Sequence, residues 1–143
     1  MNLRIILQVK NPGIPHAVVQ YPGLREADEQ ALFEFGRKLR YHPAFPKGAN
    51  VNFLEKTGEN RFYERTWERG VEDFTYACGT GTGASVYALA EKRRCGDHAE
   101  VEVKGGLLIV DIVRDGKKCR DLLLTGPASM VCTGEIFDEA ISQ

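Results

Sequence analysis

The chain has 143 residues, of which 43% are hydrophobic and 27% are charged. This composition is typical of a globular protein, and its apolar content at nearly zero net charge excludes a disordered chain. The length suits one domain, residues 1–143, that buries a core without disulfides or metal ions. Nineteen basic and twenty acidic residues give a net charge of −1, which argues against a basic nucleic-acid-binding face and a polybasic membrane anchor.

The first half of the chain is predicted to form strands and one surface helix. Apolar residues recur at spacings of three and four from Leu24 to Leu39, a pattern typical of an amphipathic helix, and Pro43 and Pro46 end it. Alternating or β-branched residues predict strands at 3–9, 17–21, 50–55 and 61–67.

The second half is predicted to begin with a different kind of helix, at 80–90, whose side chains are small or apolar on nearly every side. Such a helix is buried, and Gly96 is expected to cap it in the left-handed conformation. Glycine turns separate strands expected at 99–103, 107–113 and 120–125, and residues 130–137 are expected to close the domain. The predicted fold class is therefore α+β, with mostly antiparallel strands wrapped around a buried central helix and one amphipathic helix outside.

Four cysteines, at positions 78, 95, 119 and 132, form no C-x-x-C pair, which disfavours a zinc or redox site. The sequence contains neither an export signal nor a run of about 20 apolar residues that could span a membrane. We therefore expect a cytoplasmic protein with reduced thiols, no metal site and no membrane contact.

The segment from Tyr76 to Gly83 contains the strongest candidate for chemistry, because Cys78 directly precedes glycines and the expected buried helix. A helix N-terminus lowers the pKa of a thiol, and its free N–H groups can bind a carboxylate or phosphate. Two other interpretations stay open. Gly79, Gly81 and Ala84 fit a dinucleotide-binding pattern, although hairpins rather than β-α-β units are expected around them. Alternatively, Cys78 is an inert small residue in a crowded core.

Four more residues are candidates for binding. Glu68 and Arg69 lie together at a turn, where they could meet the ammonium and carboxylate groups of an amino acid. The alternative is a solvated ion pair on the surface. Asn50 and His16 lie in or beside rigid turns, where each could contact a ligand or satisfy neighbouring backbone groups.

Taken together, these residues resemble the C-terminal half of the diaminopimelate epimerase family. The similarity covers nearly the whole chain in the family's order, and the combination of ERG with ACGTG is its most specific part. It is carried by residues 11–19 (NPGIPHAVV), 42–46 and 50–51, 65–72 (RTWERGVE), 77–81 (ACGTG), 124–128 and 134–135.

The resemblance implies an isomerase of lysine and peptidoglycan-precursor biosynthesis that needs no cofactor and interconverts LL- and meso-diaminopimelate. Family members use two cysteines, one from each of two pseudo-symmetric halves, on opposite faces of the α-carbon. One thiolate removes the α-proton, and the other thiol returns a proton. The implied roles are an acid/base for Cys78, carboxylate binding for Gly79 and Thr80, and substrate binding or contact for Glu68, Arg69, Asn50 and His16.

The chain departs from the family pattern in two places. Many relatives have asparagine where Ile14 precedes Pro15 and His16, and Asn11 is expected to replace that asparagine. Phe74 and Tyr76 also replace smaller or polar residues just before the cysteine.

The Cys-Gly-Asn-Gly motif of the family's N-terminal half is absent. The resemblance therefore implies a truncated chain, a gene fragment or half of a split enzyme, with little or no activity alone. The expected partners are a small amino-acid substrate, the missing half in cis or in trans, and a second copy in a homodimer. Two alternatives are another cofactor-independent racemase of this fold and a non-catalytic amino-acid-binding domain.

Overall fold

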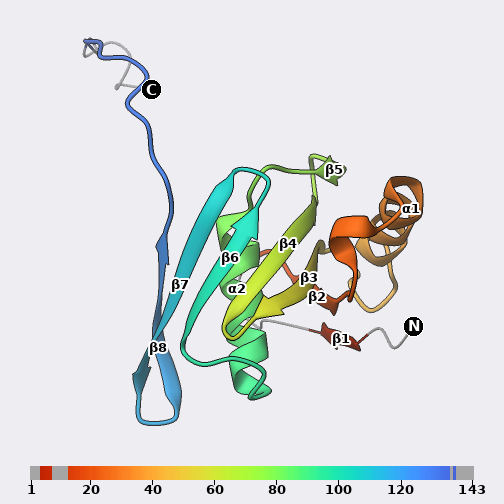
Figure 1. Ribbon diagram of the computed structural model, residues 1–143. Coiled ribbons are helices and arrows are strands. Elements are labelled where there is room, and N and C mark those ends of the chain that lie inside the picture. Colours follow the sequence, from red (N-terminus) through yellow and green to blue (C-terminus); the bar gives the residue numbers. More distant parts are fainter. Residues whose placement is uncertain (1–3, 8–12, 136, 138–143) are drawn as a thin grey trace.

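The computed structural model describes residues 4–7, 13–135 and 137, and within them eight strands form one mixed sheet (Figure 1). The sheet order is β1-β2-β3-β4-β6-β7-β8, with β5 paired to β4. The strands are β1 (Arg4–Leu7), β2 (His16–Gln20), β3 (Asn50–Gly58), β4 (Arg61–Glu68), β5 (Asp73–Phe74), β6 (His98–Val103), β7 (Gly106–Asp115) and β8 (Lys118–Thr125). The helices are a 3-10 turn at Leu24–Glu26, α1 (Glu29–Arg40) and α2 (Gly79–Glu91). The α+β prediction is confirmed.

Two of the strand pairs are parallel: β2 with β3, and β4 with β6. Parallel neighbours require a long crossover, and α1 and α2 provide one each. The sheet is mostly antiparallel, as predicted, but the expectation of hairpins instead of a β-α-β unit around the glycine-rich helix was wrong. Alternation within a strand does not identify the strand that pairs with it. The remaining pairs are antiparallel.

Each face of the sheet packs against its own helix, because successive strand residues point to opposite sides. Residues such as Val51 and Trp67 share a core with Leu32 of α1. On the other face, Val18 and Leu54 share a core with Leu89 of α2. Helix α2 contacts β2 and β3 as well as β7 and β8, so the sheet curls around it.

The predicted surface helix is divided. After the 3-10 turn, Ala27 is extended (ψ 140°), and α1 begins only at Glu29. The reason is Asp28, whose carboxylate accepts a 2.8 Å hydrogen bond from the Ala31 N–H and so caps a new helix start.

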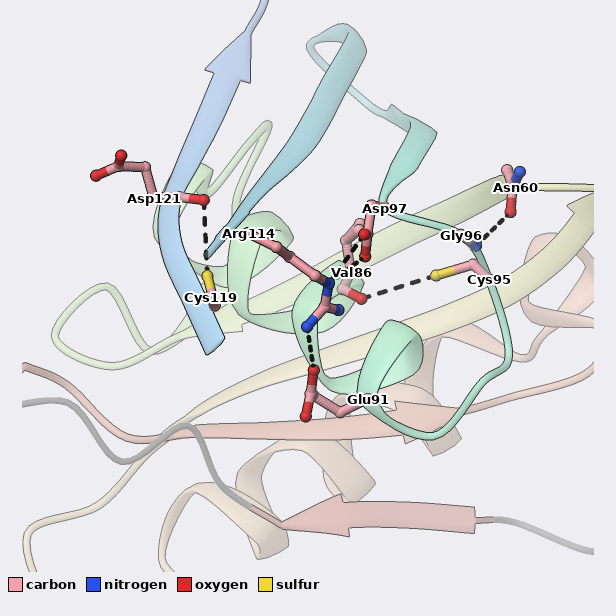
Figure 2. Close-up of polar contacts among 9 residues, drawn as sticks. All are labelled: Asn60, Val86, Glu91, Cys95, Gly96, Asp97, Arg114, Cys119 and Asp121. Carbon is pink, nitrogen blue, oxygen red and sulfur yellow. Dashed lines mark hydrogen bonds and ion pairs between the residues drawn. The ribbon is translucent and has the colours of Figure 1, made fainter. Parts of the chain in front are cut away.

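The C-terminal end of α2 is fixed by side chains (Figure 2). Arg114 of β7 bonds both Glu91 (2.9 Å) and Asp97 (2.8 Å), and the Gly96 N–H donates to Asn60 (2.8 Å). Here the left-handed residue is Arg93 (φ 55°) instead of Gly96, which corrects the expected cap.

Beyond β8, residues 126–135 have no regular secondary structure and extend away from the sheet (Figure 1). Met130 and Val131 are each 90% exposed. The expectation that residues 130–137 close the domain was wrong for residues 130–135 and 137, which have no regular secondary structure and leave the side chains of Met130, Val131 and Phe137 in solvent. In the described part of the chain, neither helix has the length and apolar character that crossing a bilayer requires.

Candidate functional site

An open pocket of about 810 Å³ lies between the start of α2, strand β8 and the segment before β2. Its polar lining comes from His16, Glu68, Cys78 and Thr80. The apolar lining includes Ile14, Val110, Leu122, Leu123 and Leu124. A mostly apolar pocket of this size with a few convergent polar groups is typical of a small-molecule site.

Cys78 is the N-cap residue, directly before the first residue of α2, as the sequence predicts. Its backbone is extended (φ −136°, ψ 95°). As at every helix start, the N–H groups of Gly79 and Thr80 have no partner within the helix. The Cys78 thiol lies 3.9 Å from the Asn50 amide nitrogen and 3.6 Å from the Thr80 hydroxyl, and only 9% of the residue is exposed.

The charge state of this thiol differs from the expectation. Burial raises the pKa of Cys78, and the charges of Glu68 and Glu64 raise it further. Hydrogen bonds from Thr80 and from the Gly81 N–H act in the opposite direction. The lowered pKa expected at a helix start is thus outweighed, and at neutral pH the thiol of this chain is protonated.

The glycines let the first turn of α2 approach its neighbours closely. A methyl group on Gly81 would overlap the side-chain oxygen of Asn52, and one on Gly79 would lie 2.7 Å from Leu124. Small residues at these two positions therefore allow α2 to contact both β3 and β8.

His16 reaches the pocket from β2 and is held by a buried polar network. The Asn52 amide donates to His16 Nδ1 (3.2 Å), and the Thr66 hydroxyl donates to the Asn52 oxygen (3.0 Å). Because Nδ1 accepts, the ring proton is assigned to Nε2. Burial lowers the pKa of His16 against an opposing effect of Glu68, so the ring is neutral at neutral pH.

The other predicted binding residues are divided between the pocket and the structure around it. Glu68, Gly79 and Thr80 line the pocket, whereas Asn50 and Arg69 do not. The Asn50 oxygen accepts from the Arg69 backbone N–H (2.7 Å), and the Arg69 guanidinium donates to the Lys47 carbonyl (2.8 Å). Asn11 lies outside the described residues.

Two features were missed by sequence reasoning. Glu64 is buried under α2, where Thr82 and Ser85 donate to its carboxylate. Alternation in the strand at 61–67 puts Glu64 on the same face as Phe62, so a charged residue at a core position was a detectable signal. The wall formed by residues 122–124 depends on the curl of the sheet, which no local pattern reveals.

The remaining cysteines do not line the pocket. Cys95 donates to the Val86 carbonyl (3.7 Å) and Cys119 to the Asp121 carbonyl (3.6 Å), as Figure 2 shows. Burial raises the pKa of Cys95 to about 11, and Cys132 is exposed. Within the described ranges, no three His, Cys, Asp or Glu residues are grouped as metal ligands.

Comparison with known proteins identifies one family. A family model described as diaminopimelate epimerase matches residues 8–131. The diaminopimelate epimerase of Leptospira biflexa is 35% identical over 124 residues, covering 87% of this chain and 41% of the relative. That of Methanothrix thermoacetophila is 39% identical over 131 residues, covering 92% of this chain and 43% of the relative. The chain thus spans less than half the length of these relatives.

Solved structures share the fold at low sequence identity. A PhzF-family phenazine biosynthesis protein of Enterococcus faecalis superposes with a TM-score of 0.57 at 17% identity, over 76% of this chain and 39% of that one. A PhzF-family protein of Bacillus anthracis gives a TM-score of 0.54 at 16% identity, over 80% and 38%.

Proposed function

Because the chain belongs to the diaminopimelate epimerase family, we propose that it supplies one half of an active site that interconverts LL- and meso-diaminopimelate. The observation that carries this proposal is the position of Cys78, whose thiol meets an open pocket at the start of a buried helix. Thr80, Glu68 and His16 line the same pocket and provide polar groups for an amino acid.

The α-carboxylate of the substrate binds at the N-terminus of α2. The N–H groups of Gly79 and Thr80 are free of intrahelical partners, and the helix end carries about half a positive charge. Glu68 supplies the opposite charge for the α-ammonium group. These two groups of the substrate orient the α-carbon toward the Cys78 thiol.

Epimerisation then needs two proton transfers on opposite faces of that carbon. A thiolate takes the α-proton and becomes a thiol, while the electron pair of the C–H bond remains on the α-carbon and its carboxylate. A thiol on the other face donates its proton to the carbon and becomes a thiolate. The α2 N-terminus stabilises the negative charge that develops on the carboxylate.

Cys78 serves as the donor in one direction and as the base in the other. Its raised pKa keeps the proton on the resting thiol, which suits the donor role. Asn50 positions Cys78 through the contact between its amide and the sulfur, and it also holds the backbone of Arg69. We assign Arg69 and Asn11 to substrate binding on the strength of the family pattern.

The second thiol comes from a complementary half, joined in cis or bound in trans. Two observations support this. The relatives are more than twice as long as the matched region. The pocket wall on β8 is also left exposed, with Leu123 54% and Leu124 48% accessible to solvent. Apolar surface of this kind is typical of an interface that awaits a partner.

The test compares the chain alone with a chimera in which it replaces the matched half of the Methanothrix thermoacetophila enzyme. Chiral chromatography of diaminopimelate measures epimerisation. We expect turnover by the chimera and none by the isolated chain, because a two-base inversion cannot proceed with one thiol. Appreciable turnover by the chain alone would refute the half-site proposal.

A further inference from the structure

Glu64 is a buried acid that the proposed mechanism does not use. Glu64 is 1% exposed and lies on the α2 side of β4. Oε1 accepts from the Ser85 hydroxyl (2.8 Å) and Oε2 from the Thr82 hydroxyl (2.5 Å). Among the described residues no cation forms an ion pair with it. A buried carboxylate held only by hydroxyl groups is costly to ionise.

Thr82 connects this acid to the cysteine. Its hydroxyl oxygen lies 2.5 Å from Glu64 Oε2 and 3.1 Å from the carbonyl oxygen of Cys78. A threonine hydroxyl has one hydrogen, which an ionised Glu64 draws toward itself. A protonated Glu64 can instead donate to the Thr82 oxygen, and the Thr82 hydrogen is then free for the Cys78 carbonyl.

Charge connects the two residues as well. Burial raises the pKa of Glu64 to about 7, so its charge changes in the neutral range. The ionised form raises the pKa of Cys78. Interacting groups titrate as a pair, so a Cys78 thiolate in turn makes Glu64 harder to ionise.

We propose that Glu64 is a positioning residue for Cys78 that acts through the Thr82 hydroxyl, which bridges its carboxylate and the Cys78 carbonyl: a neutral Glu64 favours the thiolate, and an ionised Glu64 keeps the proton on sulfur. The relevance to catalysis rests on the proposed function, whereas the coupling itself is a property of this chain. In the reaction, a neutral Glu64 would aid Cys78 as a base and an ionised Glu64 would aid it as a donor.

The other groups around the pair define the controls. Glu64 is packed against Thr82 and Ser85 of α2 and is paired across the sheet with Leu54 of β3. Cys78 also faces Glu68 and His16 at the pocket. His16 has its pKa lowered by burial, so it stays neutral where Glu64 titrates.

The test is the pH profile of Cys78 alkylation by iodoacetamide, read for this peptide by mass spectrometry in the intact chain. Only the thiolate reacts, so an isolated thiol gives a rate that rises about tenfold per pH unit below its pKa. In the unmodified chain we expect a shallower rise around pH 7, where Glu64 gains its charge. In the Glu64→Gln chain the alkylation rate should rise uniformly with pH. Above this interval its Cys78 should react about three- to tenfold faster than Cys78 of the unmodified chain.

Two variants separate coupling from a structural effect. Ser85→Ala removes a donor to the carboxylate, so the shallow interval should move to higher pH. Glu68→Gln removes another carboxylate near Cys78 and should raise the alkylation rate while leaving the interval in place. Circular dichroism checks that each variant is folded.

A uniform rise in the unmodified chain would overturn the proposal. A Glu64→Gln chain whose profile has the same shallow interval as the unmodified chain would also overturn it. If Glu64→Gln does not fold, an interval that stays in place in Ser85→Ala would overturn the proposal equally. None of these readouts requires turnover, so an inactive chimera would count against the proposed function without affecting this result.

Discussion

At the scale of single residues, the buried carboxyl of Glu64 couples folding to pH. Its pKa is about 7 in the folded chain, against 4.5 for an ordinary glutamate. The folded state therefore binds this proton more tightly than the unfolded state does. The proton on Glu64 therefore stabilises the folded state fully below about pH 4.5, and this stabilisation is lost as the pH rises through about 7. His16 acts in the opposite sense, because its lowered pKa costs stability as the pH falls.

A comparison of the unmodified chain with Glu64→Gln isolates this effect, since the other titrating groups are common to both. We expect the unmodified chain to lose stability relative to the variant by about 3 kcal/mol between pH 4.5 and pH 8. Urea unfolding at several pH values measures the difference. A difference that does not change with pH would show that Glu64 titrates alike in both states.

The position of Cys78 could be predicted from its own neighbourhood, because a cysteine followed by spaced glycines marks a helix start. Its charge state could not be predicted. That depends on burial and on Glu64 and Glu68, which the fold brings near it. Likewise, nothing local shows that Arg69 bonds the Lys47 carbonyl instead of lining the pocket.

At the scale of elements, the first turn of α2 is fitted closely to β3. Asn52 is fully buried and bonded to His16 and Thr66, so it cannot move to make room for a larger residue at Gly81. Gly83 lies two residues further along α2, and a methyl group there would meet Leu122 at an ordinary 3.7 Å.

These two glycines give a matched pair of substitutions. Gly81→Ala should destabilise the chain by about 1–3 kcal/mol through overpacking. Gly83→Ala should be neutral or stabilising by up to about 1 kcal/mol, because alanine favours the helix more than glycine does. Thermal unfolding compares them, and equal effects of the two substitutions would contradict the close fit.

Most elements could be predicted from periodicity, including the contrast between amphipathic α1 and buried α2. The break at Ala27 and Asp28 could not, because the apolar spacing continues through the cap. The parallel pairing of β2 with β3 and of β4 with β6 depends on the path of the crossovers, which alternation does not encode.

At the scale of the whole molecule, the sheet curls around α2 and leaves the pocket open beside β8. The polar groups and Cys78 form one wall of a site, and exposed leucines lie at its edge. The sequence predicted an incomplete site from its motifs, but no motif recorded that residues 126–135 leave the sheet without regular secondary structure.

The central claim, that Cys78 transfers a proton at the α-carbon, is tested most directly by deuterium incorporation. The chimera is incubated with LL-diaminopimelate in heavy water, and deuterium at the inverted α-carbon is followed by mass spectrometry and chiral separation. We predict deuterated meso product from the chimera and from its Cys132→Ala control, and a loss of about a hundred- to ten-thousandfold with Cys78→Ala. Deuterated meso product formed by the Cys78→Ala chimera at close to the unmodified rate would contradict the account.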